Sequence, residues 1–464
     1  MMTSTKNSRY RFLLVALFAI GLASGVVRAQ QPTSSPLIRT TGIVTPTAPP
    51  PAPPAGAAAG YATMPDDIVP VLPQADPTFS NQGALFETLD GRIIYGQSLD
   101  QGFNPASAIK VATTFAALRK YGPDYRFPLT VWTNGQLDAT TGTIEGDLIV
   151  SGRDFSFNYE QAVQLARDLN KQGIRTFTGD LVVSQEFTLN FDGNNQRSGE
   201  VLYDSLDAKR RPARVKKSWA TYQAATGDTS PNSPNIEVLG AVYVDNVPLN
   251  ARKVLEHRSS RLVDIAKVML CYSNNFMAEE MGESIGGPAS LDNFLTRELA
   301  LQPNDVQLAS TSGLGVNRIT PRAMMKILRG TRKELERHRL TVSDIMPVAG
   351  VDPGTLQGRY TQAPLRGSVI GKTGTLIQTD AGASALVGQM NTSQGEVLFV
   401  IFNMRGNPRT FRKSQDTLVS SIQNMYGGPL AFNYRPDSVT QRLLRTETDA
   451  ATNTEEIDPN QQRK

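Results

Sequence analysis

The chain has 464 residues, 39% of them hydrophobic and 19% charged, which is enough to build a core in two or three domains. Lysine and arginine exceed aspartate and glutamate by 47 to 43, a bias too weak to indicate nucleic-acid binding. One cysteine, Cys271, and two histidines, His257 and His338, exclude an internal disulfide and a cysteine-based zinc cluster, and leave little for a histidine metal site.

The N-terminus has the pattern of an export signal. Three basic residues precede the apolar run Phe12–Val27, and small side chains follow at Val27 and Ala29. This order predicts a signal peptide, residues 1–29, cleaved after Ala29. The alternative is an uncleaved anchor, but a run of 16 residues is short for a membrane span of about 20. We therefore expect an exported protein, in the periplasm or on the exterior of the cell envelope.

Residues 30–76 are rich in proline, alanine and threonine and lack the apolar periodicity that would bury a face. They predict a semi-extended, disordered linker. The folded body begins near residue 77. Residues 439–464 are polar and charged, and we expect them to form a frayed polar tail.

The body opens with two apolar runs separated by Asp90-Gly91, a signal typical of a β-hairpin. A helical pattern then extends from Ser107 to Tyr121 and ends at Gly122-Pro123. The next 130 or so residues are mixed. Their pattern predicts strands at 127–133, 146–152 and 179–184, a helix at 159–171, and a polar loop at 196–235.

The remaining body alternates in the same way. Residues 262–282 predict one helix, 367–376, 381–390 and 397–404 predict strands, and 411–426 predict a closing helix. Strands at both ends with helices between them favour an α+β catalytic domain interrupted by an insert. We predict the catalytic domain at 77–126 and 256–438, and the inserted subdomain at 127–255.

The first of three short motifs is Ser107-Ala-Ile-Lys110. Positions i and i+3 of a helix share one face, so the lysine amine can reach the serine hydroxyl. A serine is a weak nucleophile until a base removes its proton, and a lysine in apolar surroundings has a lowered pKa. The motif alone is weak, because a surface lysine on an ordinary helix explains it equally well.

The second motif is Ser273-Asn274-Asn275. Ser273 could relay a proton between a base and a leaving group, and Asn275 could orient a lysine and hold a substrate carbonyl. The alternative is a polar break in a helix, since Ser and Asn compete for backbone hydrogen bonds.

The third motif is Lys372-Thr373-Gly374-Thr375. A cation and hydroxyls on a strand can bind a substrate carboxylate, and Gly374 leaves room for a peptide backbone. A phosphate-binding loop is the alternative, but the segment has one spacer too few for it and continues as strand-like sequence.

In this order the three motifs are typical of penicillin-binding proteins and class A β-lactamases. Five segments of the chain resemble class C, type-4 penicillin-binding proteins, which are D-alanyl-D-alanine carboxypeptidases and endopeptidases. These segments are 104–110, 272–279, 312–321, 346–356 and 371–376. The resemblance implies a penicillin-recognising α+β fold, in which helices lie on both sides of an antiparallel sheet. It also implies that inserted material separates the first two motifs.

The resemblance also implies the chemistry. Ser107 is the nucleophile, Lys110 its base, Ser273 the proton relay, and Asn275 and Lys372 complete the catalytic set. Thr373, Gly374 and Thr375 bind the substrate, and the backbone N–H groups of Ser107 and Thr375 form the oxyanion hole. The implied substrates are peptidoglycan stem peptides, and β-lactams are the implied inhibitors. No metal or cofactor is expected, and no nucleic acid.

The chain departs from the family pattern at three places, one of which is a shorter segment after Gly315. Ser310 and Thr311 stand where the family commonly has an acidic residue and a glycine. The 166 residues from Ser107 to Ser273 are also few beside members with a large two-part insert, which implies a reduced insert.

Three alternatives compete with this interpretation. Gly282-Glu-Ser284-Ile-Gly286 matches the nucleophile elbow of another hydrolase class, although an apparent helix precedes it and His338 is the one histidine that follows. A β-lactamase would share the acylation step but must deacylate quickly. A wall-binding protein could keep the fold without turnover, but it has little need of an intact nucleophile, base and relay.

Overall fold

The computed structural model describes residues 81–450. The predicted signal peptide and linker, residues 1–29 and 30–76, lie outside this range, as does the end of the predicted tail. Within the described part of the chain, no helix is both long and apolar enough to cross a membrane.

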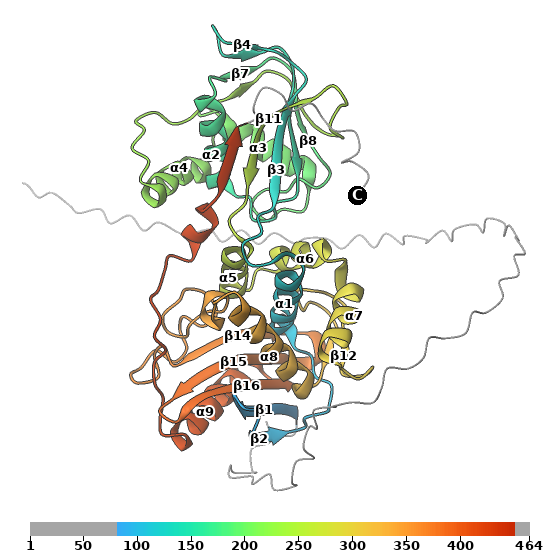
Figure 1. The fold of residues 1–464 in the computed structure, drawn as a ribbon, viewed down its shortest axis with the longest axis vertical. Coiled ribbons are helices and arrows are strands. Elements are labelled where there is room, and N and C mark those ends of the chain that lie inside the picture. The colour runs from blue at the N-terminus through green and yellow to red at the C-terminus, as the bar shows by residue number, and fades with distance from the viewer. Residues whose placement is uncertain (1–80, 451–464) are drawn as a thin grey trace, which may run out of the picture. The chain divides into compact units, whose positions relative to one another are not determined.

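One five-stranded antiparallel sheet carries the third motif on β14, and its strand order is β14-β15-β16-β1-β2 (Figure 1). The predicted hairpin around Asp90-Gly91 is confirmed, because it joins the first two strands of this sheet. The three late strands are confirmed as well. The strands are β1 (Gln82–Thr88), β2 (Ile93–Gln97), β14 (Val369–Leu376), β15 (Ala383–Thr392) and β16 (Gly395–Met404).

Alternating side chains bury both faces of this sheet. In β16, Val400 and Phe402 belong to the core shared with most of the helices, whereas Phe399 and Ile401 pack with the closing helix α9. The predicted sheet with helices on both sides is therefore confirmed. The helices are α1 (Lys110–Tyr121), α5 (Leu262–Tyr272), α6 (Asn275–Ser284), α7 (Gly287–Leu299), α8 (Pro321–Arg337) and α9 (Pro408–Met425).

The helix predicted at 262–282 is two helices. Ser273 ends α5 in the left-handed backbone region, with φ of 57°, and the side chain of Asn274 caps α6 by accepting a hydrogen bond from the Met277 N–H. An asparagine at an N-cap satisfies a backbone donor that has no partner inside the helix. The polar break therefore creates a corner, and the second motif sits on it.

The insert has its own core and its own six-stranded mixed sheet, in the order β10-β8-β6-β3-β11-β17. Two-residue strands form a second, small sheet, β4-β5-β7-β9. The larger sheet comprises β3 (Pro128–Thr133), β6 (Leu148–Gly152), β8 (Leu181–Val183), β10 (Val242–Val244), β11 (Arg252–Arg258) and β17 (Glu447–Ala450). The small sheet comprises β4 (Leu137–Asp138), β5 (Thr143–Ile144), β7 (Thr176–Phe177) and β9 (Glu237–Val238). The helix α2 (Tyr159–Lys171) lies where the sequence predicts it.

The polar loop predicted at 196–235 is wrong. Two helices, α3 (Asn195–Leu206) and α4 (Ala213–Thr226), occupy most of it. Each buries few apolar side chains, and Leu202 and Leu206 of α3 lie one turn apart on a single face. So sparse a stripe is hard to see in a polar sequence.

The frayed tail predicted from 439 is also wrong as far as residue 450. Residues Thr440–Leu444 form a 3₁₀ helix, η5, and Glu447–Ala450 form β17. The last strand pairs with β11, whose backbone offers a free edge, so no apolar side chains are needed to hold it. Since β11 spans Arg252–Arg258, the boundary expected at 255/256 falls inside a strand of the insert.

Candidate active site

Ser107 lies on a tight turn that begins α1. It belongs to the 3₁₀ helix η2 (Ala106–Ile109), and Ala106 before it has a φ of 44°, a strained value for a residue with a side chain. Two glycines let other segments close on this turn. A Cβ on Gly313 would lie 2.0 Å from the Ala106 carbonyl oxygen, and one on Gly374 would lie 3.0 Å from the Ala106 Cβ.

Lys110 is fully buried, and its amine is surrounded by oxygen atoms. The Nζ atom lies 2.9 Å from Ser107 Oγ, 2.7 Å from Asn275 Oδ1 and 2.5 Å from the Ser312 carbonyl oxygen. Burial lowers the pKa of Lys110 to about 7, and the opposing negative charge of Glu279 limits the fall. The structure thus brings together the predicted nucleophile, the predicted base and Asn275.

Lys372 binds the remaining residue of the second motif. Its Nζ atom donates to Ser273 Oγ at 2.8 Å and to the Thr373 carbonyl oxygen at 2.7 Å. Burial, helped by the like charge of Lys110, lowers the pKa of Lys372 well below its ordinary value. The lysine is fully buried, so its amine faces Ser273 and not open solvent.

A cation that the motif analysis missed, Arg412 of α9, lies beside the outer end of β14. Thr375 is partly exposed, and Arg412 of α9 donates a hydrogen bond to its Oγ1 atom at 2.9 Å. Gly374, predicted to make room for a substrate backbone, makes room for the nucleophile turn. An exposed hydroxyl beside a guanidinium is a suitable place for a carboxylate.

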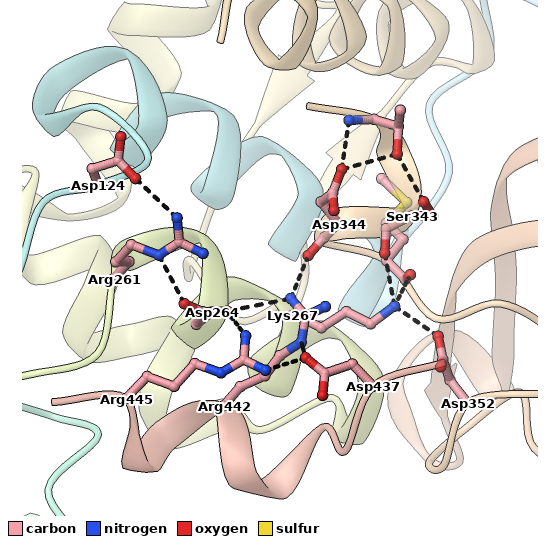
Figure 2. A network of polar contacts seen from close by, with 12 residues as sticks. Asp124, Arg261, Asp264, Lys267, Ser343, Asp344, Asp352, Asp437, Arg442 and Arg445 are labelled. Atoms are coloured by element: carbon pink, nitrogen blue, oxygen red, sulfur yellow. Dashed lines mark hydrogen bonds and ion pairs between the residues drawn. The ribbon is translucent and has the colours of Figure 1, made fainter. Parts of the chain in front are cut away.

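A polar network holds α5, whose C-terminus positions Ser273 (Figure 2). Lys267 and Asp352 are both fully buried, and Lys267 Nζ lies 2.6 Å from Asp352 Oδ2. Tyr434 donates to the same carboxylate at 2.8 Å, and three arginines pair with Asp264 nearer the start of α5. These arginines are Arg261, Arg442 and Arg445 (Figure 2).

Comparison with known proteins decides the family. The model of the D-Ala-D-Ala carboxypeptidase 3 (S13) family matches residues 73–208 and 220–425. The chain belongs to this family.

Curated relatives share this family. The D-alanyl-D-alanine carboxypeptidase DacB of Haemophilus influenzae is 25% identical over 424 residues, covering 71% of this chain and 87% of that protein. The carboxypeptidase DacB of Mycolicibacterium smegmatis is 25% identical over 375 residues, covering 74% and 80%. The predicted family and the predicted class of enzyme, a serine-type D-Ala-D-Ala carboxypeptidase, are confirmed.

Solved structures share the fold. Bd3459, a predatory peptidoglycan endopeptidase from Bdellovibrio bacteriovorus, matches with a TM-score of 0.65 at 23% identity, covering 76% of this chain and 95% of that one. Penicillin-binding protein 4 from Haemophilus influenzae matches with a TM-score of 0.55 at 20% identity, covering 75% and 96%. The predicted penicillin-recognising α+β fold is confirmed.

Other residues around the S13 site escaped the motif analysis. Asn104 accepts from the Ala106 N–H and donates to Asp380, which also pairs with Arg318 at 2.6 Å. These contacts brace the strained turn at Ala106, directly before the predicted nucleophile Ser107. Asn104 and Arg318 lie in segments that resemble the family, but Asp380, in the 3₁₀ helix η4 (Thr379–Ala381), carries no motif that would single it out.

The competing interpretations do not fit the geometry. Ser284 ends the helix α6 and donates to the Met281 carbonyl, whereas a nucleophile elbow follows a strand. Lys372 lies inside β14, whereas a phosphate-binding loop leads into a helix. Cys271 and His257 are buried, as expected for structural residues. Among residues 81–450, no group of three acidic, histidine or cysteine side chains could hold a metal ion.

Proposed function

We propose that this chain removes the terminal D-alanine from D-Ala-D-Ala stem peptides of peptidoglycan and also opens D-Ala-containing cross-links, through an acyl-enzyme on Ser107. One observation carries the proposal: the buried amine of Lys110 contacts Ser107 Oγ, and its pKa is lowered to about 7. A base must be neutral to accept a proton, and a lysine of ordinary pKa would be charged at neutral pH.

The hydrogen bonds of Lys110 direct the lone pair of its neutral amine toward Ser107. A neutral amine has two N–H donors and one lone pair. The Ser312 carbonyl oxygen and Asn275 Oδ1 accept hydrogen bonds and cannot donate, so they take both N–H groups. The lone pair is then left for the hydroxyl of Ser107.

Acylation follows in two steps. Lys110 takes the hydroxyl proton as Ser107 Oγ attacks the carbonyl carbon of the penultimate D-alanine. The peptide C–N bond then breaks, and Ser273, held by Lys372, passes its proton to the departing nitrogen. Ser273 takes up in its place the proton that Lys110 removed from Ser107, which returns Lys110 to the neutral form. Backbone N–H groups of Ser107 and Thr375 stabilise the oxyanion, and such a donor is worth about 2.7–4 kcal/mol in the transition state. Water then hydrolyses the acyl-enzyme.

The C-terminal end of β14 binds the terminal carboxylate of the substrate. Thr373 and Thr375 offer hydroxyls to the terminal carboxylate, and the guanidinium of Arg412 stands beside Thr375. Lys372, which is buried in the same strand, attracts the carboxylate by its positive charge when it is protonated. Asn275 orients Lys110 and holds the substrate amide.

The cellular setting follows from the family and the N-terminal sequence. The family acts on the cell wall, which agrees with an exported enzyme of the periplasm or outer envelope whose signal peptide ends at Ala29. β-Lactams offer a carbonyl and a carboxylate to the same groups, so we expect them to acylate Ser107. A solved relative, Bd3459, is acylated by penicillin G.

The test uses a D-Ala-D-Ala pentapeptide and a penicillin with the purified protein. We expect mass spectrometry to show loss of one D-alanine from the peptide, and one penicillin added to the protein in the peptide that contains Ser107. Ser107→Ala should abolish both. Equal labelling of Ser107→Ala would refute the nucleophile. Rapid, repeated penicillin turnover would indicate a β-lactamase, and an unreactive protein would indicate a wall-binding scaffold.

A further inference from the structure

Glu279 is a carboxylate close to the site that the mechanism above leaves unused. It lies on α6 four residues after Asn275, so the two side chains share a face of the helix. Glu279 Oε2 accepts from the Thr311 N–H at 3.2 Å and from Thr311 Oγ1 at 2.7 Å, and Oε1 accepts from the Ser312 N–H at 3.2 Å. Both oxygens of the carboxylate are therefore bound to one turn of the chain.

This turn touches the reacting groups on its other side. The Ser312 carbonyl accepts from Lys110, and Gly313 packs on the peptide between Ala106 and Ser107. The Thr311 carbonyl accepts from Thr113 of α1 at 2.7 Å. A small movement of the turn would move an acceptor of the Lys110 amine and the surface behind the nucleophile.

Thr311 is fitted to this arrangement. A Cβ on Gly282 would lie 2.1 Å from Thr311 Oγ1, so α6 has a glycine where the threonine side chain approaches it. The hydroxyl fills this space and reaches Glu279. With Ser310, Thr311 is where the sequence differs from the pattern that the resemblance implies, and its hydroxyl supplies one of the three hydrogen bonds from this turn to Glu279.

We propose that Glu279 is a positioning residue for acylation: it holds the 311–313 turn so that the Ser312 carbonyl directs the lone pair of Lys110 toward Ser107. The proposal rests on the function proposed above, since it assigns Lys110 as the base. One helix then fixes both acceptors of the amine, because Asn275 belongs to α6 and Ser312 is bound to Glu279 of the same helix.

The charge of Glu279 has a second, measurable consequence. Partial burial works to raise its pKa, but hydrogen bonds from Ser312 and Thr311 bring the pKa of Glu279 below its ordinary value. It is thus ionised at neutral pH. The charged groups that act on Lys110 are this carboxylate and Lys372 of β14. Since the negative charge favours the ammonium form, removing it lowers the pKa of Lys110, and acylation reaches its plateau at a lower pH.

The experiment measures the second-order rate constant of penicillin acylation from pH 5 to 9 in Glu279→Gln. An amide offers one acceptor where the carboxylate offers two, so one N–H of the turn loses its partner. We expect a plateau roughly ten- to a hundredfold lower, as for a misplaced catalytic group. We also expect the midpoint of the acidic limb to lie at a lower pH than in the wild type.

The neighbouring Glu280→Gln is the matched control. Glu280 faces Arg153 of the insert at 3.7 Å, and the same change of charge there should leave both plateau and midpoint unchanged. A Glu279→Gln profile that keeps either the wild-type plateau or the wild-type midpoint would overturn the proposal, because a merely structural residue would not shift the midpoint.

If Glu279→Gln fails to fold, Thr311→Val decides the matter. It keeps the carboxylate and removes one donor to it, so the plateau should fall while the midpoint stays. A wild-type plateau would overturn the proposal. Wild-type protein and Ser107→Ala are labelled in parallel. Failure of the wild type to be acylated refutes the proposed function, whereas a normal wild type with an unaffected Glu279→Gln refutes this inference alone.

Discussion

Three lysines are fully buried in the described part of the chain, and they sit in two different settings. Lys267 belongs to α5 and to its polar network, and its Nζ atom lies 2.6 Å from the carboxylate of Asp352 (Figure 2). Lys110 and Lys372 lie in the active site, and within residues 81–450 neither forms an ion pair with a carboxylate. Their amines are bound by hydroxyl, amide and carbonyl oxygens.

The difference shows what burial does to a lysine. Burial without a counter-charge disfavours the ammonium form, which yields a base at neutral pH. Burial beside a carboxylate instead yields an ion pair, which here ties α5 to the loop at Asp352. The same residue type thus serves chemistry in one region and architecture in the other, and the presence of an acidic partner separates the two.

The strongest test of this contrast is Lys110→Met. Acylation by penicillin should fall by about 10²–10⁴-fold, the range that general-base catalysis contributes. The free energy of unfolding should change by no more than about 1 kcal/mol, because the lost hydrogen bonds are offset by removing an amine that burial disfavours. Urea unfolding and the rate of penicillin labelling measure the two quantities. A large loss of stability would contradict the contrast.

Lys267→Met should show the opposite pattern. It leaves Asp352 buried and unpaired, which costs about 3–5 kcal/mol of unfolding free energy. Molecules that remain folded should still be acylated, since Lys267 does not touch the reacting groups. The double variant Lys267→Met/Asp352→Asn should recover part of the loss. An equal free energy of unfolding in Lys267→Met and wild type would show that the ion pair does not stabilise the fold.

The pH profile of the wild type sharpens the contrast further. Because Lys110 has its pKa lowered to about 7, it is neutral above that pH and charged below it. The acylation rate should rise with pH through a midpoint near 7, so that at pH 6 it is about a tenth of the plateau. Stopped-flow or gel-based labelling measures the profile. A midpoint of about 10.4, the pKa of a free lysine, would contradict the assignment of Lys110 as the base.

Arg412→Ala should have the smallest effect. The arginine is exposed, and exposed charge pairs contribute up to about 1 kcal/mol. The preference for a free terminal carboxylate over its amide, measured as the ratio of kcat/KM, should shrink by about two- to fivefold. Lys413→Ala, the next cation along α9 and also exposed, is the control and should leave the ratio unchanged. An unchanged ratio in Arg412→Ala would place the carboxylate elsewhere.

The motifs were predictable from the sequence because local spacing carries them. Ser107 and Lys110 are one turn apart, and β14–β16 read as strands from their apolar runs. That the three motifs form one site was implied by the family resemblance and not by spacing, and the structure adds the contact of Lys372 with Ser273. Three elements of the insert were harder to predict from the sequence. The helices α3 and α4 bury only a few apolar residues, and the strand β17 is held by backbone hydrogen bonds to β11.

No pattern in the sequence assigns a role to Glu279 or Arg412, although Glu279 ends a segment that resembles the family. Both are charged residues on helices, where most such residues face solvent. Their importance comes from partners far along the chain, Thr311 and Thr375, and no local pattern reports such a partner.

The sheet order also sets when the enzyme can first become active. The chain emerges N-terminus first, and β1 can pair with β2 early but meets its other neighbour, β16, only about 300 residues later. A partial chain that already holds Ser107 and Lys110 still lacks Lys372, 262 residues further on. The edge of β11 stays open until β17 is complete at Ala450. No N-terminal fragment that ends before β14 therefore contains all three motifs of the proposed site.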